Sequence, residues 1–309
     1  MPAPDDERYL RHVRPTAARP ARTEEAWAWE RWLVHVEHVG DADAPVRMLV
    51  VHGAGGNAAA MRPFAEHLAA QGALVTAIDL PGYGRTRPSR RGDLVLDDWR
   101  RLLVHAAERL DDGRPLVLVG ASMGGMLALD AAASSGRDDL VIATCLLDLS
   151  DAAVRRRVVR APLLGALAPA LLRLAVGPLR RVRLPLRWIV PMERIANDPA
   201  LAAEVLRDGR GGRTAMPLGW YRTLLAAPPV VAPERLASPP VLLLHPADDR
   251  WTPTAVSAAL LARIAAPTRL VELPGSGHFP VEEPGISLLL AEAGAAVRAL
   301  AEGRAPAWA

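Results

Sequence analysis

The 309-residue chain contains no lysine, so each of its 37 basic residues is an arginine. Without a lysine amine, the chain cannot form a Schiff base with a carbonyl substrate or attach pyridoxal phosphate. It also lacks the lysine of a phosphate-binding P-loop. Several large classes of enzyme are therefore excluded.

Cysteine is almost absent as well. The single residue, Cys145, lies in the apolar run 141–147, where we expect a buried structural thiol. One cysteine allows neither a disulfide within the chain nor a cysteine-based zinc site. No group of histidine, aspartate and glutamate residues in the sequence has the spacing of metal ligands. We therefore expect no metal and no cofactor.

The chain also has little excess of charge of either sign, because its 37 arginines are nearly balanced by 34 acidic residues and the formal net charge is only +3. A small charge spread along the chain gives little support for nucleic-acid binding, so we expect no nucleic-acid partner. The first residues of the sequence are charged and lack the apolar segment of a signal peptide. The expected location is the cytoplasm.

Half of the residues are hydrophobic, and strand patterns alternate with helical patterns along most of the chain. The expected strands are residues 32–39, 47–52, 73–79, 116–119, 141–147, 241–245 and 268–273. The expected helices are residues 61–68, 99–110, 126–133, 256–264 and 286–302. This alternation predicts an α/β fold with a doubly wound, mostly parallel sheet that binds ligands at the carboxyl ends of its strands.

The alternation stops between residues 151 and 239, where the pattern is helical and interrupted by proline. We interpret residues 151–239 as a helical cap inserted into the α/β core. The two parts of that core are then residues 27–150 and 240–309. Residues 1–26, rich in arginine, proline and alanine, are expected to form a loosely structured N-terminal extension.

A Gly-Ala-Ser-Met-Gly motif at Gly120–Gly124 directly follows the apolar run Leu116–Val119. A strand that runs through G-x-S-x-G into a helix is typical of a nucleophile elbow. The turn forces Ser122 into a strained backbone conformation and exposes its hydroxyl at the carboxyl end of the sheet. Nearby backbone N–H groups can stabilise developing negative charge.

A serine hydroxyl is a poor nucleophile unless a base removes its proton and a third group orients that base. The sequence offers both in the order Ser, Asp, His. His278 lies in a glycine-rich loop after the last expected strand, and Asp249 lies in a loop after the preceding one. Both loops are expected to reach the end of the sheet where Ser122 projects.

Together these motifs resemble the α/β-hydrolase superfamily. His52–Gly56 is similar to its oxyanion-hole loop, and Asp79–Gly84 to its D-x-P-G-x-G turn. Gly120–Gly124 is similar to its nucleophile elbow, and Gly275–Pro280 to its histidine loop. The resemblance covers almost the whole chain outside the expected cap.

The resemblance implies a role for each matching residue. Ser122 would be the nucleophile, His278 the base and Asp249 the orienting acid. The oxyanion hole would consist of the backbone N–H groups of Ala54 and Met123. His52 is expected to have a structural role.

The chain departs from the family pattern around the acid. Pro246 replaces the usual glycine before the acid loop, and Asp248 stands next to Asp249. The family spacing, with three residues before Pro253, favours Asp249. Asp148 occupies the alternative acid position that some members use.

A serine nucleophile on this fold implies an acyl-enzyme and a carbonyl substrate, and the expected reaction is hydrolysis of a carboxylic ester of a lipophilic compound. Ile195–Pro199 and the acid loop are similar to monoacylglycerol lipase and lysophospholipase-like members. The same triad also hydrolyses thioesters, lactones and C–C bonds in other members, and these reactions remain open for this chain.

Two alternatives belong to other classes. A non-catalytic ligand-binding protein can share the α/β-hydrolase fold and even retain the triad. A dinucleotide-binding oxidoreductase is suggested by Gly53–Ala58, which fits G-x-G-x-x-A after a strand, with Asp79 placed for a ribose hydroxyl. That interpretation leaves the elbow and the later motifs unexplained.

The expected cap contains an apolar run, Ala161–Leu172, that is too short to span a bilayer. Nine arginines and no acidic residue lie between Ala152 and Met192. We expect the apolar run to cover an acyl pocket above Ser122. Two interpretations of the arginines remain open: weak contact with an anionic membrane surface, or solvation and pairing with carboxylates of the core.

Overall fold

The computed structural model describes residues 7–137 and 139–309. Nine strands form one sheet in the order β1-β2-β4-β3-β6-β7-β10-β11, with β5 paired to β2. The strands are β1 (Arg22–Trp29), β2 (Trp32–Val39), β3 (Val46–Val51), β4 (Ala73–Ile78), β5 (Arg87–Pro88), β6 (Leu116–Gly120), β7 (Leu140–Ala143), β10 (Val241–Pro246) and β11 (Thr268–Leu273).

The six strands from β4 to β11 in this order run parallel, whereas β1, β2 and β5 are antiparallel. The strands β2, β3, β4, β6, β7, β10 and β11 coincide with the expected strands to within a few residues. The predicted doubly wound, mostly parallel sheet is thus confirmed.

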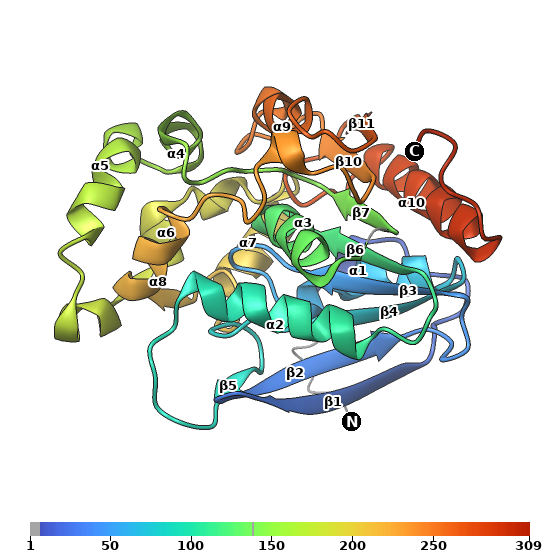
Figure 1. The fold of residues 1–309 in the computed structure, drawn as a ribbon, viewed down its shortest axis with the longest axis horizontal. Coiled ribbons are helices and arrows are strands. Elements are labelled where there is room, and N and C mark those ends of the chain that lie inside the picture. Colours follow the sequence, from blue (N-terminus) through green and yellow to red (C-terminus); the bar gives the residue numbers. More distant parts are fainter. Residues whose placement is uncertain (1–6, 138) are drawn as a thin grey trace.

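Helices cover both faces of the sheet. They are α1 (Ala58–Ala69), α2 (Leu96–Arg109), α3 (Met123–Ser135), α9 (Thr254–Leu261) and α10 (Gly285–Ala301). α2 and α3 lie on one face, and α1 and α10 lie on the other (Figure 1). Because β3 lies between β4 and β6, the crossovers diverge at β3, and in such sheets the ligand crevice forms at this point.

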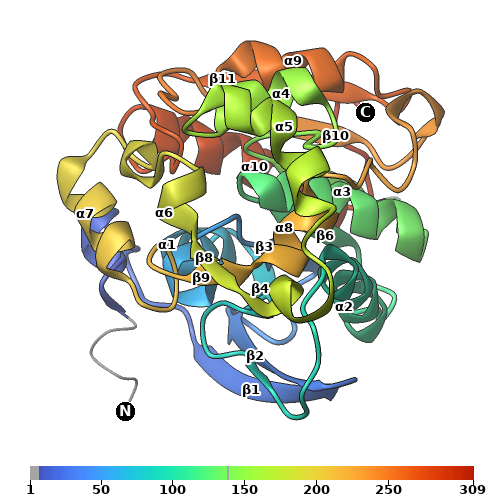
Figure 2. The same ribbon diagram turned by 90° about the vertical axis from the view of Figure 1, so that its left-hand side faces the viewer.

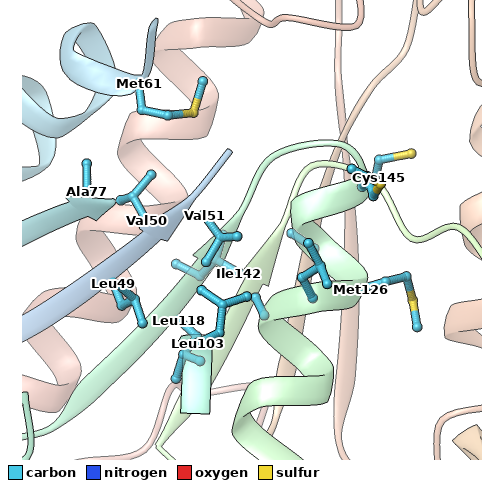
Figure 3. Close-up of a cluster of buried hydrophobic side chains, with 14 of the residues drawn as sticks. Leu49, Val50, Val51, Met61, Ala77, Leu103, Leu118, Met126, Ile142 and Cys145 are labelled. Atoms are coloured by element: carbon cyan, nitrogen blue, oxygen red, sulfur yellow. The ribbon is translucent and has the colours of Figure 1, made fainter. Parts of the chain in front are cut away.

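The central strands β3 and β6 are apolar apart from Arg47 at the start of β3, because both of their faces are covered. Figure 3 shows Met61 of α1 near the central strands, whereas Met126 projects from the side of α3 that faces away from them, and both side chains are buried. Cys145 is buried there as expected, and burial raises the pKa of its thiol to about 12. Its thiol is therefore a structural group.

The expectation of a loose extension over residues 1–26 was wrong for residues 22–26, because β1 begins at Arg22. Only Trp27 and Trp29 of this strand are buried, and its first four residues are polar, so the sequence lacks a clear strand pattern. Before it, η2 (Leu10–His12) is a 3₁₀ turn next to the buried Tyr9, whose hydroxyl donates to Asp208 at 2.8 Å. The described part of this segment is therefore attached to the cap segment.

Residues 151–239, the cap segment, contain short helices around a two-stranded antiparallel ribbon of β8 and β9. Its elements are α4 (Ala152–Val158), α5 (Pro162–Leu172), η3 (Gly177–Arg181), β8 (Arg183–Pro185), α6 (Leu186–Ile189), η4 (Met192–Arg194), α7 (Pro199–Arg207), β9 (Ala215–Pro217), α8 (Leu218–Leu224) and η5 (Pro233–Arg235). In Figure 2 this segment faces the viewer. Its boundaries stay a prediction.

A buried ion pair connects β2 to α1. Glu37 and Arg62 are each 2% exposed, and Arg62 Nε and Nη2 donate to the two carboxylate oxygens at 3.0 and 2.7 Å. Burial alone would raise the pKa of Glu37. Hydrogen bonds from His35 and Arg62 and the charges of Arg62 and Arg22 outweigh burial and lower the pKa to about 2.

We expect Glu37→Gln to lower the free energy of unfolding by about 3 kcal/mol at pH 7, because the substitution leaves the Arg62 charge buried without its partner. Since the pKa of Glu37 is depressed on folding, the wild-type advantage is present above pH 4.5 and decreases as the pH falls towards 2. Urea unfolding at several pH values measures both effects. Glu292→Gln, which breaks the exposed pair with Arg269, should cost less than about 1 kcal/mol; equal losses would contradict the prediction.

Candidate active site

The chain turns from β6 into α3 within two residues, Ala121 and Ser122, and Ser122 has a φ of 54° and a ψ of −126°. The strain predicted from the sequence is therefore present. A Cβ at Gly120 would lie 2.2 Å from the Gly124 carbonyl oxygen, and one at Gly124 would lie 2.3 Å from that of Val51. Only glycine at these two positions lets α3 pack this closely against β3 and β6.

The turn places the Ser122 hydroxyl against His278. The Oγ–Nε2 distance is 2.7 Å, and His278 Nδ1 lies 2.7 Å from Asp249 Oδ2. These residues follow β6, β10 and β11, so they meet at the carboxyl ends of three parallel strands. The tautomer that fits both bonds carries its proton on Nδ1 and accepts the serine proton at Nε2.

The environment of Asp249 keeps its carboxyl group ionised. Its Oδ1 accepts hydrogen bonds from the N–H groups of Trp251 and Thr252 at 2.7 and 2.9 Å. Burial by itself would raise the pKa of Asp249. The charge and hydrogen bond of His278 and the two backbone N–H groups outweigh burial and lower that pKa.

The two competing aspartates have other partners. Asp248 accepts the N–H of Gly275 at 2.9 Å, which shapes the histidine loop. Asp148 accepts both the N–H and the hydroxyl of Ser150. Asp249 is the aspartate that the structure brings to His278.

The two expected oxyanion donors lie next to Ser122. Met123 is the first residue of α3, so its N–H has no acceptor within the helix. The Ala54 N–H has no backbone acceptor among the described residues. A Cβ at Gly53 would lie 2.8 Å from Ser122 Cβ, so this loop approaches the serine at close range.

His52 and Asp79 fix this loop and its surroundings through buried hydrogen bonds. His52 is fully buried, with Nδ1 donating to the Gly53 carbonyl at 2.8 Å and Nε2 accepting the Leu80 N–H at 3.0 Å. Asp79 is 2% exposed, and its carboxylate accepts the N–H groups of Ala58 and Arg85, both at 2.7 Å. Both oxygens of Asp79 are thus engaged inside the protein, which argues against a role in binding ribose.

Two residues that sequence analysis missed support His278. Glu282 accepts the N–H groups of Gly277 and of Asn197 and Asp198 in the cap segment, at 3.0–3.1 Å. The Trp251 ring lies against the imidazole, with a centroid distance of 4.6 Å. Nothing in the sequence pattern around Glu282 distinguishes it from a surface acid, because two of its three partners, Asn197 and Asp198, lie more than 80 residues away in the sequence.

Trp251 also connects the histidine to the cap segment, because its indole N–H donates to the Val158 carbonyl of α4 at 2.7 Å. The Phe279 N–H donates to the Ile195 carbonyl at 2.7 Å. The position of the imidazole therefore depends on the cap segment as well as on the core.

A cavity of about 70 Å³ opens beside Ser122 and His278, with almost wholly apolar walls. It lies between the sheet and helices α1 and α10, and residues from Ala60 to Leu68 of α1 line it. The helix rises by about 12 Å over the eight steps from Ala60 to Leu68. On α10 the cavity reaches Leu289 and Ala293, and the cap segment contributes Ile195 and Val205.

The expectation that Ala161–Leu172 covers this cavity was wrong. No residue of that run lines it, and Leu163 of α5 is 73% exposed. Gly165 is the buried residue of the helix and packs against Val159 and Arg155 of the cap segment itself. α5 therefore presents its leucines to the surroundings and not to the serine.

The structure brings together one group of potential metal ligands among the described residues: Glu24, His35 and Glu37, whose ligand atoms lie within 4.8 Å of one another. Arg22 and Arg85 bind the Glu24 carboxylate at 2.6 and 2.7 Å, and Arg62 binds Glu37. Since arginine already neutralises both carboxylates, the group is explained as an ion-pair network.

Comparisons with known proteins show what the chain is similar to. The model of the alpha/beta hydrolase family matches residues 48–286. A monoacylglycerol lipase of Mycolicibacterium smegmatis is 29% identical over 263 residues, which cover 81% of this chain and 87% of that protein.

Among solved structures, a monoacylglycerol lipase of Paleococcus ferrophilus has a TM-score of 0.66 at 19% identity, covering 87% of this chain and 98% of its own. A soluble variant of the monoglyceride lipase of Saccharomyces cerevisiae, in complex with a substrate analogue, has a TM-score of 0.70 at 17% identity. That match covers 89% of this chain and 94% of the yeast chain. These similarities support the fold.

Asp249→Asn should lower kcat by about 10⁴, because the amide favours the imidazole tautomer that cannot accept the serine proton. Asp248→Asn and Asp148→Asn are the matched controls and should each cost less than about tenfold. Hydrolysis of a p-nitrophenyl ester measures all three. A larger loss at Asp148 than at Asp249 would assign the acid to the end of β7 instead.

Proposed function

The chain belongs to the alpha/beta hydrolase family, and we propose that within it the protein is a serine hydrolase that cleaves carboxylic esters of lipophilic compounds through an acyl-enzyme. The observation that carries the proposal is the pair of 2.7 Å contacts that connects Ser122 through His278 to Asp249. A structural serine has no need of an oriented base.

In the proposed reaction, His278 takes the proton of Ser122 as Oγ attacks the ester carbonyl carbon. The N–H groups of Ala54 and Met123 stabilise the negative charge on the carbonyl oxygen. Collapse of the tetrahedral intermediate transfers the proton from His278 to the departing alcohol and leaves the acyl group on Ser122. A water molecule, activated by the same imidazole, then releases the acid.

The apolar cavity is the proposed acyl-binding site. It begins at Ser122, and its walls offer no charge to a carboxylate or a peptide. The similarity to a monoacylglycerol lipase supports a fatty acyl ester of a small alcohol as the substrate class. The acyl chain would then enter the space between the sheet and helices α1 and α10.

We expect kcat/KM on p-nitrophenyl esters to rise from acetyl through butyryl to octanoyl, by up to ~0.8 kcal/mol for each buried methylene. Ala293→Leu should shorten the preferred chain because Ala293 lines the cavity. Ala296→Leu is the matched control, since Ala296 is buried on the same helix but does not line it.

Ser122→Ala supplies the zero of this assay and should lose about 10⁶ in kcat. A fluorophosphonate should label the wild type at Ser122 and spare the variant. Labelling without turnover of any ester would favour a ligand-binding protein with a retained triad. A rate that is highest for acetyl and falls steadily with chain length would overturn the acyl-site assignment.

We also propose weak contact of the cap segment with an anionic membrane surface. Leu163 of α5 and Leu174 just after it are 73% and 71% exposed, and Trp188 is 62% exposed. An apolar face of this kind next to cationic side chains suits the interface of a bilayer. In the described part of the chain, none of the helices has the length and hydropathy to cross a membrane. The cytoplasmic location stays a prediction.

Not all nine arginines of this region face outward. Arg155 of α4 is buried and donates to the carbonyl oxygens of Leu149 and of Gly165 in α5. It therefore connects α4 to α5. Arg160 pairs with Glu193. The remaining exposed cations, such as Arg156 and Arg173, supply the charge for the proposed contact.

Flotation with phosphatidylglycerol-containing vesicles tests the contact. Leu163→Ser with Leu174→Ser should weaken binding at least tenfold, because two leucines no longer enter the apolar layer. Val230→Ser with Leu270→Ser changes two exposed apolar residues outside α5 and the turn after it, one near the end of the cap segment and one on β11, and should have little effect. Binding should also weaken as salt rises. Equal binding by both double variants would refute the contact.

A further inference from the structure

A second cavity, of about 830 Å³, lies between the core and the cap segment. One wall is the core loop 82–94, and the other consists of residues 180–183 and 209–217. Figure 2 shows the loop that follows β5 below the ribbon of β8 and β9. This cavity shares no lining residue with the one at Ser122. We refer to it as the arginine cavity.

Its walls are strongly cationic. They contain seven arginines and one carboxylate, although the whole chain has a net charge of only +3. The arginines are Arg90, Arg91, Arg180, Arg181, Arg183, Arg210 and Arg213. The carboxylate belongs to Asp93, and its two oxygens are already bound by Arg180 at 2.7 Å and by Arg181 at 3.0 Å.

Two N–H donors in the walls have no acceptor among the described residues. One is Nε1 of Trp32, a residue that is only 6% exposed, and the other is Nε of Arg180. Burying a donor without an acceptor costs about 1–3 kcal/mol. Within the described part of the chain, Arg183 and Arg213 also have no carboxylate partner.

A site with many cations and unpaired N–H donors favours a ligand that is anionic and rich in acceptor oxygens. Guanidinium groups stay protonated and bind phosphate oxygens in a bidentate manner. We propose that the arginine cavity binds a phosphate-bearing ligand, either a free phosphate compound or the phosphate headgroup of a lipid.

Such a ligand would join the core to the cap segment. The two walls already touch through the ion pairs of Asp93 and through a hydrogen bond from the Gly84 N–H to the Arg210 carbonyl at 2.8 Å. A phosphate group between them would offset the mutual repulsion of the arginines. It would thereby stabilise this junction, and the proposal stands whether or not the protein hydrolyses esters.

Titration calorimetry with pyrophosphate, at an ionic strength held constant with sodium chloride, tests the site. We expect saturable binding to the wild type that weakens at least tenfold in Arg183→Gln with Arg213→Gln. Arg207→Gln with Arg235→Gln is the matched control: it removes the same charge from two exposed arginines outside the cavity and should bind like the wild type. Thermal unfolding of each variant separates lost binding from lost folding.

A second arm distinguishes the source of the phosphate. Vesicles containing phosphatidic acid are compared with phosphatidylglycerol vesicles of equal surface charge. If pyrophosphate binding depends on the cavity arginines and vesicle binding does not, the ligand is a free phosphate compound. Retention on phosphatidic acid that the cavity variant loses, and that the control keeps, indicates a headgroup. If neither probe distinguishes the cavity variant from the control, the proposal is overturned.

Discussion

The strained turn at Ser122 is the constraint on which the rest of the site depends. Ser122 has a φ of 54°, and α3 packs so closely on the strands that a Cβ at Gly120 or Gly124 would lie 2.2 or 2.3 Å from a backbone oxygen. The same close packing brings the Gly53 loop against the serine. Strain at one residue therefore positions both the nucleophile and the expected oxyanion donors.

The histidine depends on a different kind of support. It lies on a loop, and a loop alone does not fix an imidazole to the precision of a hydrogen bond. Here Asp249 and Trp251 hold the ring from the core, while Glu282 connects its loop to backbone N–H groups of the cap segment. Trp251 also donates a hydrogen bond to the Val158 carbonyl of α4. A movement of the cap segment would therefore change the position of the imidazole more than that of the nucleophile elbow.

Much of this could be predicted from the sequence because the signals were local. The elbow, Asp249 and His278 each lie just after an apolar run that ends a strand, and parallel strands bring such ends together. β1, Glu282 and the position of α5 were missed for a shared reason. The first half of β1 is polar and exposed, and the cap-segment partners of Glu282 are distant in sequence. An apolar run such as that of α5 carries no information about which surface it covers. Tertiary contacts decide all three.

The absence of lysine has a structural counterpart. Arg62 binds both oxygens of Glu37 from a buried position, and Arg155 reaches the carbonyl groups of two separate segments. Each task needs a planar group with several donors, which a lysine ammonium does not offer. Arginine also keeps its charge when buried, so the cations of the arginine cavity cannot relieve their repulsion by losing protons. An anionic ligand of the proposed kind would offset it.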